Sequence, residues 1–154
     1  MIVRESTEQD ISQLVELRMQ LFVEMGDIEH TAAAPRLREA TEAYFIEATQ
    51  SDYTRSWIAF VNETVVATGT LTEFRRPPYL GNLAGREAYL LNMFTLPPYR
   101  RKGVARQLLN QITAFAKSQG YGKVWLHASQ DGRILYEHFG FAPNPHEMEW
   151  ILHQ

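Results

Sequence analysis

Apolar and polar residues recur along the chain in two different periods, which predict two kinds of element. In residues 11–24 and 104–116 the apolar residues return every three or four positions, as on one face of a helix. Pro35, a residue favoured in the first turn of a helix, predicts another helix up to about Thr49. A short helix is expected after Ser129. The pattern therefore predicts about four helices.

Short apolar runs rich in β-branched and aromatic residues predict the strands. These runs are residues 2–4, 57–61, 65–71, 89–94, 123–128 and 148–152. The turn residues 62–64 predict a hairpin between the second and third runs. The strand–helix–strand order after residue 89 predicts a crossover between parallel strands. We therefore expect one mixed α/β sheet with helices on both of its faces.

Length and composition narrow the function classes. A chain of 154 residues with 45% hydrophobic residues suits one domain, residues 1–154, with a core of its own. The net charge of -3 argues against nucleic acid as the main partner, because phosphate backbones require a dense basic surface. The chain has no cysteine, which excludes a disulfide scaffold, a thiolate zinc site and a cysteine nucleophile.

Several other classes lack their sequence signals. The first residues do not resemble a signal peptide, and no run approaches the ~18 apolar residues of a membrane span, so we expect a cytoplasmic protein without a membrane partner. The histidines have no metal-ligand spacing, so no metal is expected. A P-loop and a dinucleotide-binding glycine motif are also missing.

The segment from Arg100 to Ala105 carries the strongest chemical signal. It joins an apolar strand to an amphipathic helix, and the first N–H groups of a helix have no partner within the helix. The helix dipole and three basic residues, Arg100, Arg101 and Lys102, add positive charge there. The segment therefore predicts an anion site suited to a pyrophosphate. The alternative is an ordinary basic helix start on a solvated loop.

Two motifs carry a family resemblance. Residues 100–105 resemble the (Gln/Arg)-x-x-Gly-x-(Gly/Ala) signature of the GNAT superfamily of N-acetyltransferases, and residues 135–141 are similar to its Leu-Tyr-x-x-x-Gly-Phe motif. The resemblance covers essentially the whole chain and is clearest over residues 89–141. It implies an α/β (α+β) fold, with a mixed, mostly antiparallel central sheet of about six to seven strands flanked by about four helices. It also implies an acyltransferase that uses acetyl-coenzyme A as co-substrate.

The resemblance implies a set of cofactor-binding residues. Backbone N–H groups after Tyr99 would hold the pyrophosphate, the strand end would hydrogen-bond the pantetheine arm, and a bulge in that strand, near Met93 or Phe94, would point an N–H at the thioester carbonyl. Ser129 stands where family members often carry an asparagine that contacts the pantetheine. The implied residues are Met93, Phe94, Thr95, Arg100, Arg101, Lys102, Gly103, Val104, Ala105, Arg106 and Ser129.

Tyr136 matches the family tyrosine that protonates the departing thiolate. A phenol with a pKa near ~10 can give its proton to a thiolate, although Tyr136 could equally be a core residue of its helix. Glu73, Glu87 and His127 are candidates for the general base, and each also has a plain structural interpretation. Because no cysteine is present, the amine is expected to attack directly in a ternary complex.

The acceptor is expected to be a primary amine of a small molecule or a peptide. It would enter between the first two helices and the strand ends, where the acidic residues near Ile28 hint at a cationic amine, or simply mark an exposed helix pair. The expected acceptor residues are Phe22, Met25, Asp27, Asn92 and His127.

Two rival functions and one assembly stay open. The anion turn would also suit a non-catalytic acyl-coenzyme A sensor, and the basic residues would suit a nucleic-acid or protein partner domain. The apolar last strand, residues 150–152, could pair across a homodimer.

Overall fold

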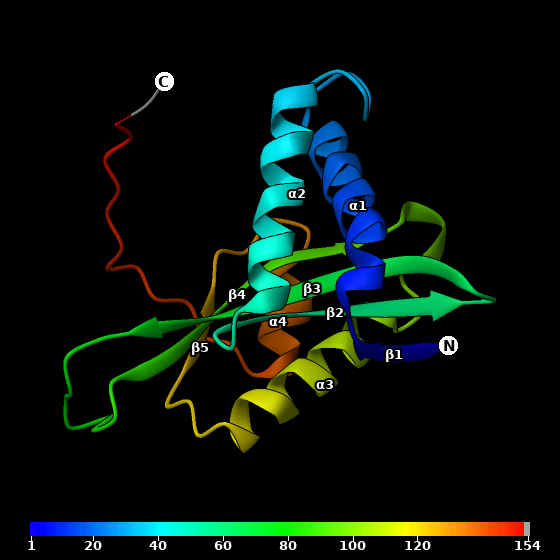
Figure 1. Ribbon diagram of the computed structural model, residues 1–154. Helices are drawn as coiled ribbons and strands as arrows, with labels where there is room; N and C mark the ends of the chain where they lie inside the picture. The colour runs from blue at the N-terminus through cyan, green and yellow to red at the C-terminus, as the bar shows by residue number, and fades with distance from the viewer. Residues whose placement is uncertain (153–154) are drawn as a thin grey trace.

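A sheet of five strands, in the order β1-β2-β3-β4-β5, forms the centre of the computed structural model, which describes residues 1–152 (Figure 1). The first four strands pair antiparallel, and β5 pairs parallel to β4. The strands are β1 (Ile2–Glu5), β2 (Thr54–Val61), β3 (Thr64–Arg75), β4 (Arg86–Thr95) and β5 (Val124–Leu126). The predicted mixed sheet, its hairpin and its parallel crossover are confirmed.

Helices cover both faces of this sheet. Figure 1 shows α1 (Ile11–Met25) and α2 (Pro35–Gln50) on one face, and α3 (Val104–Ser118) and α4 (Arg133–Phe139) on the other. Two short 3₁₀ helices, η1 (Glu8–Asp10) and η2 (Pro97–Tyr99), precede α1 and α3. The expected number of about four helices is confirmed.

Each face of the sheet has its own hydrophobic core. On one side Leu108, Leu109 and Ile112 of α3 are fully buried against the sheet. On the other side Leu14 and Met19 of α1 pack with residues of α2 and β2. Two cores form because the central strands have buried side chains on both faces of the sheet. Each face is then covered by helices, and α3, for example, buries one apolar stripe against it.

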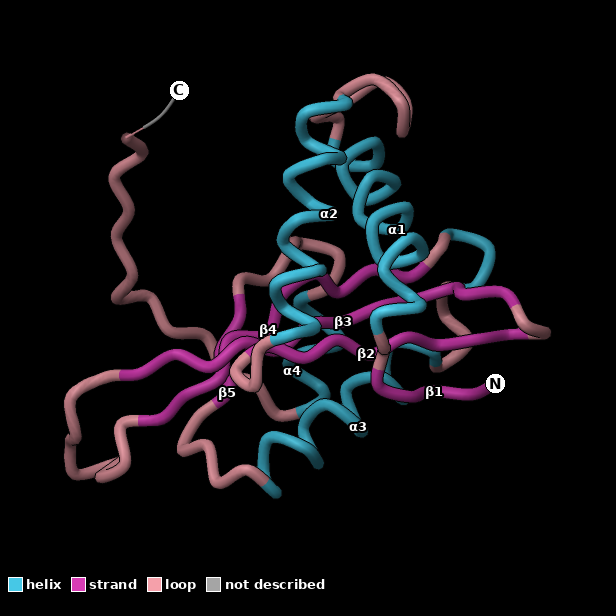
Figure 2. The backbone as a smooth tube through the Cα atoms, viewed as in Figure 1, coloured by secondary structure: helices cyan, strands magenta, loops and turns pink. Residues whose placement is uncertain are grey.

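The expected sixth strand, residues 148–152, is wrong. Figure 2 draws the chain after α4 as a loop that leaves the sheet, and Met148 and Trp150 are 95% and 86% exposed. The physical reason is that β5, the edge strand it would have to join, offers only three residues for pairing. Pro143 and Pro145 lie in the segment between α4 and residue 148 and lack N–H donors of their own. The sheet therefore has five strands rather than six to seven.

Candidate active site

The strands β4 and β5 pair over only part of the length of β4. Their register runs from Ala88 opposite Val124 to Leu90 opposite Leu126, where β5 ends. β4 continues to Thr95, so the edge that faces β5 is open from residue 91 onward. An open strand edge presents N–H and C=O groups that an extended ligand can pair with as an added strand.

The open part of β4 begins with a β-bulge. Leu91 pairs with Thr70 and Phe94 with Thr68, so two residues of β4, 92 and 93, stand opposite the single residue 69 of β3. Asn92 adopts a left-handed φ of 58°, which asparagine tolerates better than most residues. The irregularity lies at residues 92–93, whereas the family resemblance implies a bulge near Met93 or Phe94.

Gly69 makes room for this bulge. A Cβ atom at residue 69 would lie 2.4 Å from Met93 Sδ and 2.8 Å from Ile112 Cδ1. Met93 therefore packs directly over the glycine backbone and against α3. A side chain at residue 69 would force the Met93 and Ile112 side chains to move.

The turn before α3 leaves several backbone N–H groups free. Arg101 and Gly103 have left-handed φ angles of 60° and 81°, and α3 begins directly afterwards at Val104. No side chain of residues 1–152 caps this helix, and its first backbone bond joins the N–H of Gln107 to the carbonyl of Gly103. Nothing lies within 4 Å of the position a Cβ would take at Gly103. The turn is thus an open nest of amides at the positive end of a helix dipole.

The basic residues of this turn have two different roles. Arg100 folds back, donating from Nε to the Thr95 carbonyl at 2.8 Å and pairing with Glu24 of α1 at 2.6 Å. Its side chain therefore braces the turn against β4 and α1. Arg101, Lys102 and Arg106 are exposed and have no carboxylate partner in the described part of the chain, which leaves their charge available to an anion.

Tyr136 lies half-buried on α4, against the core under α3. Its ring packs edge-on against Phe141 with centroids 5.8 Å apart, and burial raises the pKa of its hydroxyl. The phenol therefore stays protonated at neutral pH. Ser129 lies close by, where its Oγ accepts the Gly132 N–H at 3.1 Å and keeps its own hydrogen available to donate.

Glu73 and Glu87, two of the base candidates, are held in ion pairs. Glu73 accepts from Arg75 at 2.8 Å and Arg86 at 2.7 Å. Glu87 is fully buried and accepts from Arg76 at 2.6 Å. Burial alone would raise the pKa of each carboxyl, but these hydrogen bonds outweigh it, so the pKa of each is lowered. Both carboxylates are therefore ionised and form structural ion pairs, at the end of β3 and β4 next to the connecting loop.

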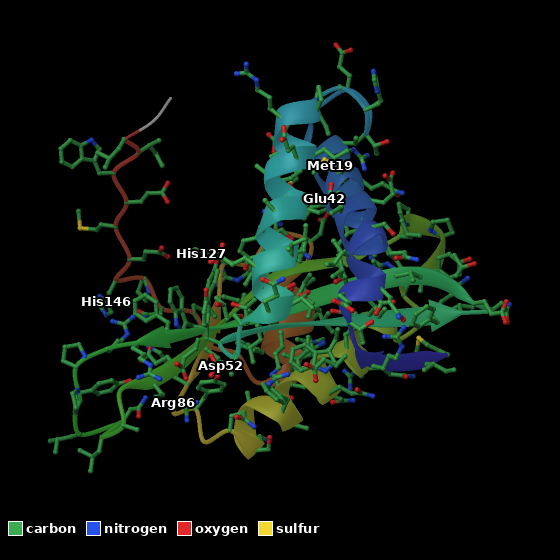
Figure 3. The ribbon with its side chains drawn as sticks, viewed as in Figure 1. Met19, Glu42, Asp52, Arg86, His127 and His146 are labelled. Atoms are coloured by element: carbon green, nitrogen blue, oxygen red, sulfur yellow. The ribbon has the colours of Figure 1, made fainter. Side chains whose placement is uncertain are left out.

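His127, the third candidate, follows β5 and lies beside the C-terminal segment (Figure 3). Its Nδ1 contacts the Tyr89 hydroxyl at 2.6 Å, and its Nε2 contacts the Glu147 carboxylate. Both ring nitrogens are therefore engaged by side chains of the protein.

A cavity of about 240 Å³ opens between α1, α2 and β4. It is lined by Arg18, Phe22, Leu37, Ala40, Thr41, Tyr44, Phe45, Leu91 and Asn92. Of the expected acceptor residues, Phe22 and Asn92 lie in this lining. Met25, Asp27 and His127 are not part of this lining. Met25 is the exposed last residue of α1, and Asp27 is exposed just beyond it.

Sequence reasoning missed Arg18, the only charged residue of that lining. Its Nη1 donates to Asn92 Oδ1 at 3.2 Å, and its guanidinium lies 4.8 Å from the centre of the Phe22 ring. A signal was present in the sequence. Leu14, Arg18 and Phe22 are four residues apart on one row of the helix, so a charge interrupts the apolar stripe that faces the sheet.

Two classes of site are not found in residues 1–152. No group of three or more His, Asp or Glu side chains there is placed to hold a metal ion. No helix of that part is long and apolar enough to cross a bilayer.

A family model matches residues 14–141 and is described as the acetyltransferase (GNAT) family. This match covers most of the chain, both motifs and the bulged strand. The chain therefore belongs to the acetyltransferase (GNAT) family.

Curated relatives match over part of their length. The chain is 35% identical to an aminoglycoside N(6')-acetyltransferase type 1 of Acinetobacter genomosp. 13 over 43% of this chain and 44% of that protein. It is 29% identical to YsnE, an uncharacterized N-acetyltransferase of Bacillus subtilis (strain 168), over 67% of this chain and 66% of that protein. The chain thus spans less than two thirds of each of these relatives.

Solved structures match nearly the full chain. A predicted acetyltransferase from Clostridium acetobutylicum, solved with acetyl-CoA, is 28% identical with a TM-score of 0.86, covering 98% of this chain and 96% of that chain. The aminoglycoside N-acetyltransferase AAC(6')-Iy in complex with CoA is 20% identical with a TM-score of 0.77, covering 97% and 93%. Both likenesses show that this chain shares its fold with these acetyltransferases.

Proposed function

We propose that this protein transfers an acetyl group from acetyl-coenzyme A to a primary amine of a small molecule or peptide. One observation carries the proposal. The open edge of β4 begins at a bulge and leads, within a few residues, to the amide nest before α3. An extended thioester carrier with a diphosphate at one end matches this continuous path.

Different residues along this path bind different parts of acetyl-coenzyme A. The amides from Arg101 to Arg106 bind the diphosphate, with Arg101, Lys102 and Arg106 adding charge around it. The backbone of Met93, Phe94 and Thr95 pairs with the pantetheine arm. Ser129 donates one hydrogen bond from the α4 side. This assignment is supported by the free amides, the open edge and the family's motifs.

The reaction proceeds by direct attack of the neutral amine on the thioester carbonyl. A backbone N–H at the bulge of residues 92–93 stabilises the developing oxyanion. Tyr136 gives its proton to the departing thiolate, since a phenol is protonated at neutral pH and can act as an acid there. The base is assigned to water, since Glu73 and Glu87 are ion-paired at the far end of their strands.

Two measurements test the proposal together. Calorimetry with acetyl-coenzyme A should give one site per chain, and a panel of primary amines should release free thiol in the presence of the protein. Binding without thiol release for any amine would favour a non-catalytic acyl-coenzyme A sensor. An absence of binding at saturating acetyl-coenzyme A would overturn both functions.

The proposal includes a cytoplasmic homodimer. The outer edge of β5 has no partner among residues 1–152, and the neighbouring C-terminal segment exposes Met148, Trp150 and Leu152. Pairing of this segment with the other protomer would cover both surfaces. Light scattering should therefore give a dimer mass for the full chain and a monomer mass after Trp150→Glu. A monomer mass for the full chain would contradict this part of the proposal.

A further inference from the structure

Arg18 is a sheltered cation whose neighbours in the protein are neutral. Its guanidinium contacts the Asn92 amide and the Phe22 ring, and it forms no ion pair with any carboxylate of residues 1–152. The other sheltered arginines, Arg38, Arg55 and Arg86, each have a carboxylate within 2.9 Å. Among the partly buried arginines of residues 1–152, Arg18 is therefore the one without a carboxylate partner.

A sheltered, unpaired charge costs free energy unless a ligand compensates it. Burial lowers the pKa of Arg18, which reflects this cost, yet an arginine stays charged at neutral pH. A planar guanidinium offers two parallel N–H donors, which match a carboxylate in geometry. The open side of Arg18 faces the cavity between α1, α2 and β4. The cavity thus presents a binding group for an anion.

The other residues of the lining indicate what kind of molecule fits the cavity. Phe22, Leu37, Phe45 and Leu91 supply apolar surface, and no acidic residue lines the cavity. Its volume, about 240 Å³, lies below the range of about 300–1,000 Å³ common for drug-sized ligands. A compact, partly apolar molecule fits these properties better than a large polycation.

Asn92 ties this cavity to the reacting centre. It accepts the hydrogen bond from Arg18 and is also the first residue of the bulge. Consecutive Cα atoms are about 3.8 Å apart, so a molecule held at Arg18 lies within one small ligand's length of the Met93 backbone. An amine on that molecule can therefore reach a thioester at the bulge.

We infer that the acceptor is a small amine that carries a carboxylate and an apolar body, as in a free apolar amino acid, and that Arg18 binds this carboxylate. The inference rests on the proposed function for the amine and on Arg18 for the carboxylate. It opposes a polycationic acceptor such as an aminoglycoside, because Arg18 would repel a second cation in the same small cavity.

Pairs of amines that differ only in the carboxylate test the inference. The pairs are leucine with 3-methylbutylamine and phenylalanine with 2-phenylethylamine, with kanamycin as a polycation. The kcat/KM from thiol release should be at least about 10-fold higher for the amino acid of each pair, given the strength of charge-assisted hydrogen bonds. Equal or better use of the decarboxylated amines or of kanamycin would overturn the inference.

Variants of Arg18 provide the second arm of the test. In Arg18→Met the preference for the amino acid over its decarboxylated partner should fall roughly 10- to 100-fold, and Arg18→Lys should retain part of it. This ratio is measured within one preparation, so a partly unfolded variant still reports it. The matched control is Arg36→Met on exposed α2, which removes a charge outside the cavity and should leave the ratio unchanged. A preserved ratio in Arg18→Met would overturn the inference.

A binding measurement separates this inference from the proposed function. Calorimetry of leucine with the protein saturated with coenzyme A requires no transfer. Binding that disappears in Arg18→Met would support the carboxylate site even if no amine released thiol, an outcome that would overturn only the proposed function. Thiol release from amines, without binding of leucine that depends on Arg18, would support the proposed function and overturn this inference.

Discussion

The two sides of the bulged strand β4 offer a ligand different kinds of group. Toward β5 and α3 the proposed binding groups are backbone amides, whose position depends on the conformations of Asn92, Arg101 and Gly103. Toward α1 and α2 the proposed binding groups are side chains that converge from three elements, Arg18 among them. On this division the proposed cofactor side should be sensitive to backbone strain, and the proposed acceptor side to the identity of a few side chains.

The largest effect is expected at Tyr136. Replacing Tyr136 by Phe should slow transfer at saturating substrates by at least about 10²-fold, because the acid for the thiolate is lost. The Kd of acetyl-coenzyme A should change little. Since burial raises the pKa of Tyr136, the wild-type rate should fall at high pH only above the ordinary tyrosine value of about 10, and this loss should be absent from the variant. Tyr121→Phe, at another half-buried tyrosine, is the control, and an equal loss there would contradict the role of Tyr136.

A smaller effect is expected at the amide nest. Gly103→Val should weaken acetyl-coenzyme A binding roughly 10- to 100-fold, because a β-branched residue resists a φ of 81°. Gly120→Val is a matched control, since Gly120 has a φ of 73° and open space around it at the other end of α3. Both variants should lose similar thermal stability, and calorimetry should show weaker binding only for Gly103→Val. Equal affinities in the two variants would contradict the nest.

Asn92 belongs to both sides, so two substitutions separate its roles. Asn92→Val should cost about 1–3 kcal/mol in the free energy of unfolding, because valine disfavours a φ of 58°. Asn92→Gly should retain more stability, because glycine adopts that φ readily, and it should still raise the KM for the acceptor by removing the partner of Arg18. Denaturant unfolding and steady-state kinetics measure the two effects. Equal stability of the two variants would show that the bulge does not depend on this φ.

The smallest effect is expected at the ion pair that joins the two sides. Glu24 of α1 pairs with Arg100 at 2.6 Å, and both side chains are partly exposed, at 43% and 39%. Glu24→Gln should therefore cost less than about 1 kcal/mol in the free energy of unfolding, and less in high salt. The Kd of acetyl-coenzyme A should change less than about threefold on the same grounds. A larger change in affinity would show that α1 controls the nest, against the division proposed here.

Much of the fold could be predicted because the sequence patterns are local. The stripe of α3 and the apolar run of β4 specify their elements without information from the rest of the chain. The segment at residues 148–152 has the composition of a strand, but an edge strand forms only with a partner, and no local pattern encodes one.

The candidate site divides in the same way. The turn proposed for the anion could be located from sequence because it lies between a strand and a helix. The cavity proposed for the acceptor could not, because Arg18, Tyr44 and Asn92 are far apart in the sequence and meet only after folding. Asp27 is acidic and close to the expected entrance, yet it is exposed in the turn after α1 and does not line the cavity.

The direct succession of β4, the turn and α3 also has a consequence for how such a chain can change over time. Every group assigned to the thioester carrier, apart from Ser129 and Tyr136, falls within one short contiguous stretch, residues 92–106. If α1 and α2 bind the acceptor as proposed, mutations in these two helices should change the choice of acceptor while leaving this stretch untouched. A directed-evolution library confined to α1 and α2 would exploit the same modularity.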